Sequence, residues 1–407
     1  MTTMIVSVAT LAGLIVFDVR TSTTADGIDA WRARSIADSA IAAAVAELNA
    51  ELNADPDWQT NFQHGVLTPP ASWMEGEFRY MLTNEAGDLE TLGDGQFTLT
   101  AFGSSGRADA ARQVTLAAKK APVESLDKAI YVSNDLAVSA GSQGSIATDG
   151  KLRVQDDITS GADRIFAEEV QQTGDPDPLG GTATSNWYDY YVNNGTEIPA
   201  SALQRERLFG LITVGYRLED LVLSANHNPF GAANPNGIYY IRGNGLYIDI
   251  RDCRIAATLV LLDVGWFSSL RGNLHISPHN PDLPALMVDG AINHRALAGT
   301  LSEAALGINF NPTHTPYRGQ SDATLSGEYP SRIEGIVYAD RNYVVHAGSS
   351  LPISGKLVVG GSLTVNSPLV VLNRTPFPIQ PPPGFQRVDG FIVQPGTYRS
   401  VSSDWAP

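Results

Sequence analysis

The most apolar part of the chain is an uncharged run from Met4 to Phe17, which stops at Asp18 and Arg20. The run is shorter than the roughly 20 residues of a spanning helix and also fits a signal-peptide core, so the flanks must decide between them. No Lys or Arg precedes Met4, and no small-residue cleavage site follows Phe17. We therefore expect an uncleaved single-pass membrane anchor, carried by Met4, Ile5, Val6, Leu11, Leu14, Ile15, Val16 and Phe17.

A second, amphipathic pattern follows the anchor after a short polar gap. Apolar residues recur from Ile28 to Leu52 at spacings of three, four and five, with Ala enriched between them, which predicts a helix. Pro56 ends it, because the residue before proline is pushed out of the helical region. Residues 1–54 therefore form the first predicted unit. The alternative that spacing leaves open is a signal anchor attached to an unrelated globular helix.

Residues 55–121 carry short alternating segments separated by Gly-rich turns. The predicted strands are Glu77–Leu82, Gln96–Phe102 and Ala111–Leu116. Alternation interrupted by such turns is typical of a small antiparallel β meander. We expect this neck to link the helix to a larger body.

From residue 122 to about 375, short apolar segments of three to five residues recur, punctuated by Gly or Asn-Gly. Lys151–Val154 and Leu363–Val365 are two of them. This recurring pattern of short apolar segments and turns favours a β-helix or β-solenoid, in which the stacked rungs share one apolar interior. A β-sandwich is the alternative, although its strands would be longer. In the solenoid, Ile336, Val345, Val358 and Leu363 are expected to point inward and Lys356 outward. The fold class is thus mainly β behind a long N-terminal helix.

Two segments depart from the rung pattern. Residues 161–224 hold the turn Asp175–Gly181 and an aromatic cluster, and we expect them to leave the solenoid and pack along its side. Residues 376–407 begin with a proline-rich stretch, and proline lacks the backbone donor for regular pairing. We expect this tail to run extended along the last rungs or to cap them.

Charge and cysteine content narrow the functions further. The formal net charge is −16, which disfavours binding to nucleic acid or to anionic lipid headgroups. The single cysteine, Cys253, excludes an internal disulfide and any site built from several cysteines. It lies in an alternating run, where a small buried apolar role is the simplest interpretation.

The residues typical of catalysis and metal binding do not form a recognised pattern. His275 and His279 are four apart, but Pro278 and the β setting prevent the helical face that a zinc pair needs. The candidate carboxylates for a polysaccharide-cleaving β-helix are Asp156, Asp157, Asp249, Asp252 and Asp263. Neighbours on a strand point to opposite faces, so Asp156 and Asp157 cannot serve one cleft. We predict no catalytic, cofactor-binding or metal-binding residues, and no enzyme activity.

Calcium is the one cofactor that the sequence leaves open. Asp175 with Asp177, and Asp55 with Asp57, offer the hard oxygen ligands that calcium takes, without the loop regularity of an EF-hand. The candidates for ligand or partner contact are aromatic, because rigid rings stack on sugars or on a partner surface. They are Trp187, Tyr188, Tyr190 and Tyr191, and packing onto the body is the favoured alternative for them.

The phrase from Trp31 to Leu48 resembles the N-terminal helix of type IV minor pilins and type II secretion pseudopilins of the PilX and K-component kind. Those helices read roughly Ala-Arg-x-x-Ala-Glu-Ala-Gly-Ile-x-x-Ala-x-x-x-Leu. The chain matches at Ala33, Arg34, Ala37, Ile41, Ala44 and Leu48, with Asp38 in place of Glu and Ala40 in place of Gly. The stretch from Phe97 to Val114 also resembles the strand-glycine-strand hairpin of PilX-like proteins.

The resemblance implies a structural envelope protein that joins other pilin or pseudopilin subunits through its N-terminal helix. It also implies an inner-membrane anchor in lipid and a body in the periplasm or on a pilus, serving assembly, secretion or adhesion, with a surface carbohydrate among the partners. No basic leader ending in Gly precedes the apolar run, and from this we expect the natural chain to begin upstream of Met1. The alternatives are a surface-anchored β-helix enzyme acting on acidic polysaccharides and a tailspike-like carbohydrate-binding module.

Overall fold

The computed structural model describes residues 25–54, 62–73, 75–84, 96–106, 108–122, 126, 128–139, 144–148, 151–154, 157–159, 164–172, 188–208, 212–373 and 382–402. The predicted membrane anchor lies outside these residues. The chain is mainly β with a long N-terminal helix, as predicted. It divides into a helix-sheet unit, made of the residues up to Ala121 together with those from Val388, and a parallel-strand unit, Pro122–Arg387.

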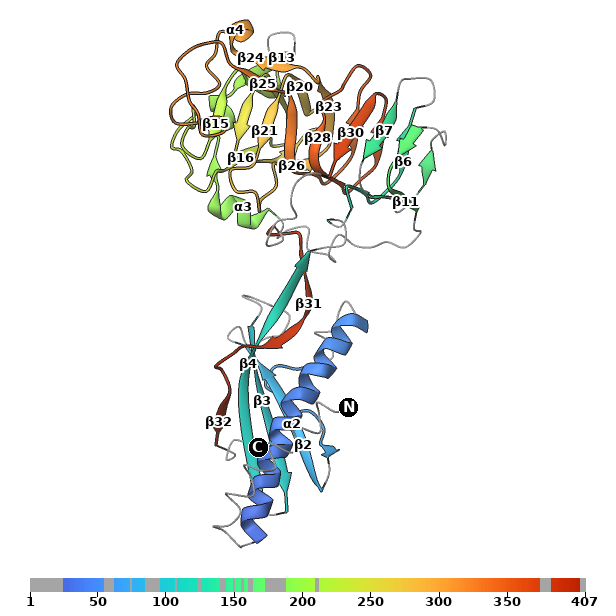
Figure 1. Ribbon diagram of the computed structural model, residues 1–407, viewed down its shortest axis with the longest axis vertical. Helices are drawn as coiled ribbons and strands as arrows, with labels where there is room; N and C mark the ends of the chain where they lie inside the picture. Colours follow the sequence, from blue (N-terminus) through green and yellow to red (C-terminus); the bar gives the residue numbers. More distant parts are fainter. Residues whose placement is uncertain are drawn as a thin grey trace. The chain divides into compact units, whose positions relative to one another are not determined.

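The helix-sheet unit places one long helix against an antiparallel sheet (Figure 1). Its strands follow the spatial order β1-β2-β3-β4-β31, and β32 also pairs with β4. Strands β2, β3 and β4 form the antiparallel meander that alternation predicts for the neck. The elements are α2 (Ala25–Ala54), β1 (Ala71–Trp73), β2 (Gly76–Thr83), β3 (Gln96–Ser105), β4 (Ala108–Pro122), β31 (Gln386–Val393) and β32 (Arg399–Val401).

Small residues let α2 approach the sheet closely. A side chain at Gly103 of β3 would lie 2.4 Å from the carbonyl oxygen of Ala33 and 2.5 Å from the amide of Ala37, so only glycine fits there. Further along the helix, larger apolar side chains fill the space over the sheet. The fully buried or nearly buried helix positions are Ala33, Ile36, Ala37, Ala40, Ile41, Ala44 and Leu48.

The C-terminal segment completes the sheet of this unit, which corrects the prediction for residues 376–407. Instead of following the last rungs of the body, β31 pairs with β4, and β32 pairs with β4 in antiparallel register, with Arg399 opposite Gln113. The proline-rich stretch misled the prediction, because the aromatic and β-branched residues Phe391, Ile392 and Val393 that follow it have the composition of a strand. The parallel-strand unit is therefore an insertion between two neighbouring strands of one sheet.

The parallel-strand unit is built on two sheets (Figure 1). The larger sheet contains β5 (Ile130–Val132), β7 (Ser145–Thr148), β8 (Lys151–Val154), β10 (Ile165–Phe166), β11 (Glu169–Gln172), β12 (Thr196–Glu197), β15 (Val222–Ser224), β16 (Ile238–Arg242), β18 (Arg254–Ala256), β19 (Thr258–Val264), β21 (His275–Ser277), β22 (Leu286–Gly290), β26 (Arg332–Ala339), β28 (Ile353–Val359) and β30 (Pro368–Leu372). The smaller sheet contains β6 (Leu136–Val138), β9 (Ile158–Thr159), β13 (Gln204–Leu208), β14 (Ile212–Glu219), β17 (Tyr247–Arg251), β20 (Ser269–Gly272), β23 (Ile292–Ala296), β27 (Tyr343–Val345) and β29 (Leu363–Val365).

The strands of both sheets pair in parallel, except for the antiparallel pair β13 and β14, and one apolar core lies between the sheets. In the larger sheet Ile241 lies beside Leu261, and in the smaller sheet Ile250 lies beside Leu270. These residues, with their equivalents in the other strands, belong to one continuous buried cluster. Large parallel sheets of this kind are compatible with the predicted β-helix body.

The strands are not stacked in the order of the chain. Ile130 of β5 lies beside Leu357 of β28, and Leu136 of β6 lies beside Leu363 of β29. The first strands after β4 thus pair with the last strands before β31. The first described strand of the insertion, β5, and its last, β30, both pair with β28, so the insertion starts and ends beside the same strand.

The predicted insertion at 161–224 is largely wrong. Its residues include β10 and β11, which pair in parallel with β7 and β8, and β14, which pairs in parallel with β17. The segment that leaves the strand pattern is 297–331, between β23 and β26, which contains β24 (Thr300–Ser302), α4 (Glu303–Leu306) and β25 (Glu328–Pro330). Buried Arg254 of β18 joins this segment to the strands by donating to the carbonyl oxygens of Phe310, at 2.6 Å, and Thr315, at 2.7 Å.

Part of the larger sheet is buried on both faces, which overturns part of the predicted interior. Val345 and Leu363 point into the core between the sheets, as expected, but Ile336 and Val358 point away from it into a second apolar cluster. Lys356, the expected exposed position, is 3% exposed, and its Nζ donates to the carbonyl oxygen of Lys128. The helix α3 (Asp189–Asn194) contributes Tyr191 to the second cluster, so the outer face is covered rather than solvated.

Replacement of Phe391 should show that the C-terminal strand stabilises the helix-sheet unit. Its ring is buried and packs edge-on against Phe97 at 5.4 Å between centroids. We expect Phe391→Ala to lower the free energy of unfolding of this unit by about 3–5 kcal/mol, through lost burial and a residual cavity. Denaturant unfolding followed by the circular dichroism of the helix measures it.

The neighbouring residue provides the control. Ile392 follows Phe391 directly and is 52% exposed, so Ile392→Ala should change the free energy of unfolding by no more than about 0.5 kcal/mol. Equal effects of the two substitutions would contradict the packing of β31 described above.

Candidate functional site

The structure uses most of the predicted aromatic contact patch for packing. Tyr191 is fully buried, and its hydroxyl donates to the carbonyl oxygen of Pro383 at 3.0 Å. Tyr188 packs against the second apolar cluster and lies 6.4 Å from the ring of Tyr338. Tyr190 is 41% exposed, and Trp187 lies outside the described residues. The arrangement therefore favours the packing interpretation over a ligand contact for Tyr188 and Tyr191.

The candidate carboxylates do not converge on one cleft. Asp249 belongs to β17 in the smaller sheet, whereas Asp263 belongs to β19 in the larger sheet and is exposed. Asp252 lies in a turn with a φ of 46°, where its Oδ1 accepts from the amide of Asn273 at 2.8 Å. Asp157 is exposed, and Asp156 lies outside the described residues. Only Asp249 is surrounded by charged partners.

The predicted ligands for calcium, Asp55, Asp57, Asp175 and Asp177, also lie outside the described residues. Within the described ranges, no three His, Cys, Asp or Glu side chains gather as a metal site would require. Over the same ranges, no helix is both long enough and apolar enough to cross a bilayer.

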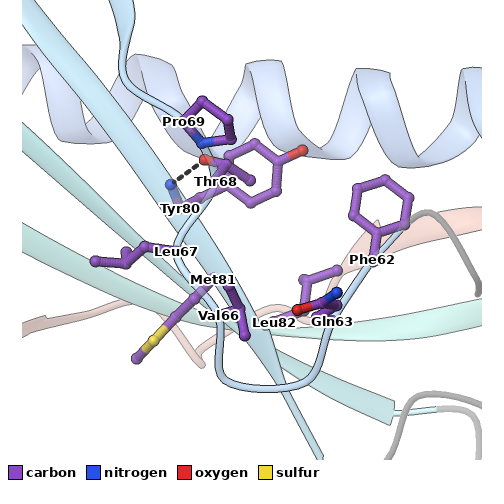
Figure 2. A pocket seen from close by; sticks show the side chains of 9 residues that line it. All are labelled: Phe62, Gln63, Val66, Leu67, Thr68, Pro69, Tyr80, Met81 and Leu82. Atoms are coloured by element: carbon purple, nitrogen blue, oxygen red, sulfur yellow. Dashed lines mark hydrogen bonds between the residues drawn. The ribbon is translucent and has the colours of Figure 1, made fainter.

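A small hollow of about 190 Å³ lies in the helix-sheet unit beside β2 (Figure 2). The segment before β1 forms one wall and is held along β2 by hydrogen bonds, including one from the amide of Tyr80 to Oγ1 of Thr68 at 3.0 Å. Burial raises the pKa of the Tyr80 hydroxyl, so it does not ionise near neutral pH. The lining residues are Phe62, Gln63, Val66, Leu67, Thr68, Pro69, Tyr80, Met81 and Leu82. The lining contains no carboxylate, histidine, lysine or arginine side chain.

The outward face of the smaller sheet concentrates charge instead. Alternation sends Leu218, Ile250 and Leu270 into the core and their neighbours outward. Parallel register then aligns the outward residues of successive strands into columns. We call this surface the arginine face, defined by Arg217, Glu219, Asp249, Arg251, Ser269, Arg271, Asn293, Arg295 and His346.

Asp249 is the centre of the arginine face. Its side chain is 4% exposed, and its oxygens lie 3.0 Å from Nη2 of Arg251 and 3.1 Å from Nε of Arg271. The hydroxyl of Ser269 also donates to it, at 2.6 Å. The third arginine, Arg217, lies 3.9 Å away. A carboxylate held by several cations and a hydroxyl is fixed in position, so Asp249 is a structural anchor of this face.

Two further carboxylates lie at one end of the same face. Glu219 accepts from Arg217 at 3.1 Å and from Arg251 at 3.4 Å. Glu206 of β13 pairs with Arg217 as well. Three carboxylates therefore compensate Arg217, Arg251 and Arg271 at this end, and the compensation stops before the next strand.

The next strand carries Arg295, which lies beside Arg271 in parallel register. Arg295 is exposed, and its Nη2 lies 3.4 Å from Nε2 of His346. Burial and then the charges of Arg295 and Arg271 lower the pKa of His346, so this imidazole is neutral at pH 7 and adds no charge of its own. Along the arginine face, carboxylates therefore neutralise the arginines of β14, β17 and β20, whereas the described residues offer Arg295 of β23 no such partner.

The sequence contains no local signal for this face. Arg251, Arg271 and Arg295 are far apart in the chain and each looks like an ordinary solvent-facing strand residue. They become neighbours only through the strand register, which the predicted rungs did not specify. Asp249 was singled out as a candidate acid, and the structure gives it ionic partners instead.

Comparisons with known proteins identify no family for the chain. No family model matches it, and no curated protein matches it. Among solved structures, the chain is similar to the competence-associated pilin ComZ from Thermus thermophilus at 14% identity and a TM-score of 0.33, covering 93% of this chain and 99% of ComZ. It is also similar to the ice-binding protein of the Antarctic ascomycete Antarctomyces psychrotrophicus, at 9% identity and a TM-score of 0.29, over 62% of this chain and 97% of that one. A likeness at such TM-scores carries no argument about function.

Removal of the charge at Asp249 should destabilise the parallel-strand unit. We expect Asp249→Asn to lower the free energy of unfolding by about 1–3 kcal/mol, because it leaves partly buried arginines without their shared anion. Asp263→Asn is the matched control, since Asp263 is exposed and asparagine tolerates its φ of 48°. Denaturant titration of both variants measures the difference, and equal stability would contradict the anchoring role of Asp249.

Proposed function

We propose that the chain is a structural, non-enzymatic envelope component of the minor-pilin or pseudopilin kind. In this proposal the apolar N-terminal segment anchors it in the bacterial inner membrane. The helix-sheet unit joins other pilin-like subunits, and the parallel-strand unit is a β-solenoid displayed outside the cytoplasm for assembly, secretion or adhesion.

The observation that supports this proposal most is the role of the residues that resemble pilins. Ala33, Ala37, Ile41 and Leu48 carry the sequence resemblance, and all four are buried where α2 packs on the sheet. Gly103, in the hairpin that also resembles PilX-like proteins, is a position where the helix backbone leaves no room for a side chain. The resembling residues thus build one helix-on-sheet contact, which links the resemblance to a shared way of packing.

The position of the insertion also fits a display role. The parallel-strand unit leaves the sheet after β4 and the chain returns as β31, so the helix-sheet unit contains both α2 and the C-terminal strands β31 and β32. A subunit built in this way can keep its helix for assembly while a large unit is added at one edge.

The exposed face of α2 offers a surface for subunit contacts. Ile28 is 48% exposed and Trp31 is 44% exposed, although both are large apolar residues on a helix that is otherwise well packed. Exposed apolar residues that lie close together mark interaction sites. Arg32 and Glu75 form an ion pair of 2.5 Å beside Trp31, in the rim of a hollow of about 250 Å³.

Substitution of these two residues tests the proposal. We expect the double variant Ile28→Ala, Trp31→Ala to fold normally but to disappear from sheared surface filaments or from cross-linked pseudopilin complexes of the host, as measured by immunoblot. Val66→Ala is the control, because Val66 is a 52% exposed apolar residue of the same unit outside α2. Absence of the unaltered chain from such assemblies would overturn the proposal, as would unchanged incorporation of the double variant.

A further inference from the structure

We propose that the arginine face binds an anionic saccharide, in which Arg271 and Arg295 hold one carboxylate or sulfate group while Trp266 and Phe267 stack on another sugar ring of the same polymer. This inference rests on the proposed function, because only a displayed unit would meet such a polymer. The arginine face thus takes the place of the aromatic residues around Tyr188 and Tyr191 as the candidate ligand-binding surface.

A comparison of the arginines with their carboxylate partners along the arginine face shows where an anion fits. Arg217, Arg251 and Arg271 share Glu206, Glu219 and Asp249 as partners. Among the described residues, Arg295 has no carboxylate within ion-pair distance, and its Nη2 lies 3.4 Å from Nε2 of the neutral His346. One positive charge is therefore left uncompensated at the position next to Arg271.

The guanidinium of Arg271 is oriented for an external ligand. Its Nε donates to Ser269 at 3.0 Å and faces Asp249 at 3.1 Å, which fixes the side chain from within the face. Its two terminal nitrogens have no hydrogen-bond partner among the described residues, and the side chain is 41% exposed. A guanidinium held through Nε presents its remaining donors as a planar fork, which suits the two oxygens of a carboxylate or sulfate.

The strand register brings the two arginines to a matching distance. Arg271 of β20 and Arg295 of β23 are directly paired in parallel strands, and neighbouring strands lie about 4.8 Å apart. One small anion between the two side chains can accept hydrogen bonds from both. Without an anion, the two like charges repel each other.

An exposed aromatic pair stands in the turn that leads into β20, five and four residues before Arg271. Trp266 is 61% exposed and Phe267 is 76% exposed, in the turn that precedes β20. The turn is held in place, because Nδ2 of Asn293 donates to the carbonyl oxygen of Trp266 at 2.7 Å and the hydroxyl of Ser268 donates to that of Gly265 at 2.8 Å. Large rings that are exposed on an ordered turn offer a rigid platform at little entropic cost, which suits stacking on sugar rings.

A saccharide fits this combination better than other polyanions. A nucleic acid presents closely spaced phosphates and needs many cationic contacts, whereas the net charge of this chain is −16. An acidic sugar polymer presents one anionic group for each ring or two, next to an apolar ring face. Screening at physiological salt limits the long-range repulsion to about 8 Å, so local complementarity decides binding.

The test is a calorimetric titration of the detergent-solubilised full chain with three probes at physiological salt. They are oligogalacturonate, a sulfated oligosaccharide, and methyl-esterified oligogalacturonate. The ester is the control, because it has the same sugar rings as the first probe without the negative charges. We expect the acidic probes to bind and the ester not to bind. A preference between the first two distinguishes carboxylate from sulfate.

Variants locate the site. Arg295→Gln and Trp266→Ala should each weaken binding about tenfold or more, since each removes a charge-assisted hydrogen bond or a stacking platform. Arg242→Gln is the matched control, because Arg242 is an exposed arginine of the larger sheet, and it should leave the affinity unchanged. Circular dichroism checks that every variant is folded.

Three outcomes would overturn the inference. The first is that neither acidic probe binds, and the second is that Arg295→Gln binds as tightly as the unaltered chain. The third is that the unaltered chain self-associates and Arg295→Gln dissociates it, which would assign the face to a second copy. Each of these three outcomes can occur while the chain is still incorporated into filaments. Failure of the saccharide-binding proposal is therefore distinguishable from failure of the proposed function.

Discussion

The structure depends on the return of the C-terminal strand to the sheet from which the parallel-strand unit departs. Asn49 of α2 holds this strand at the backbone of Phe391, accepting from its amide at 2.6 Å and donating to its carbonyl at 3.3 Å. The helix, the sheet and the end of the chain are thereby joined in one core. The inserted unit fits this constraint, because its first described strand, β5, and its last, β30, both pair with β28.

The same parallel register that builds the inserted unit also builds its surface. Each strand sends alternate residues to the core and to the outside, so a residue type repeated at one position becomes a column. In the smaller sheet this places Arg251, Arg271 and Arg295 side by side. Three carboxylates stabilise the first part of this arrangement and leave the last arginine exposed. The binding proposal follows from that imbalance rather than from the overall charge, which is acidic.

Local patterns predicted the elements of the fold well and their partners poorly. The helix beyond Ile28, the meander of β2 to β4 and the short strands of the body follow from periodicity within a few residues. The pairing of β31 with β4 joins residues far apart in the chain, and no local pattern encodes it. Lys356 was misassigned for a related reason: alternation gives the side of a strand, but it does not show that α3 and Phe385 cover the outer side of the larger sheet. The arginine face required the register as well, so the sequence pointed to Tyr188 and Tyr191 instead.

The most direct test of this account compares hydrogen exchange in the full chain with exchange in a chain that ends at Arg387. If β31 and β32 complete the helix-sheet unit, their removal should speed the exchange of amides in α2, β3 and β4 by large factors, because these elements lose a neighbouring strand and part of their core. Amides of β19, β22 and β26 should keep their protection. Unchanged protection of α2 and β4 in the shortened chain would contradict the central claim that both ends of the chain build one unit.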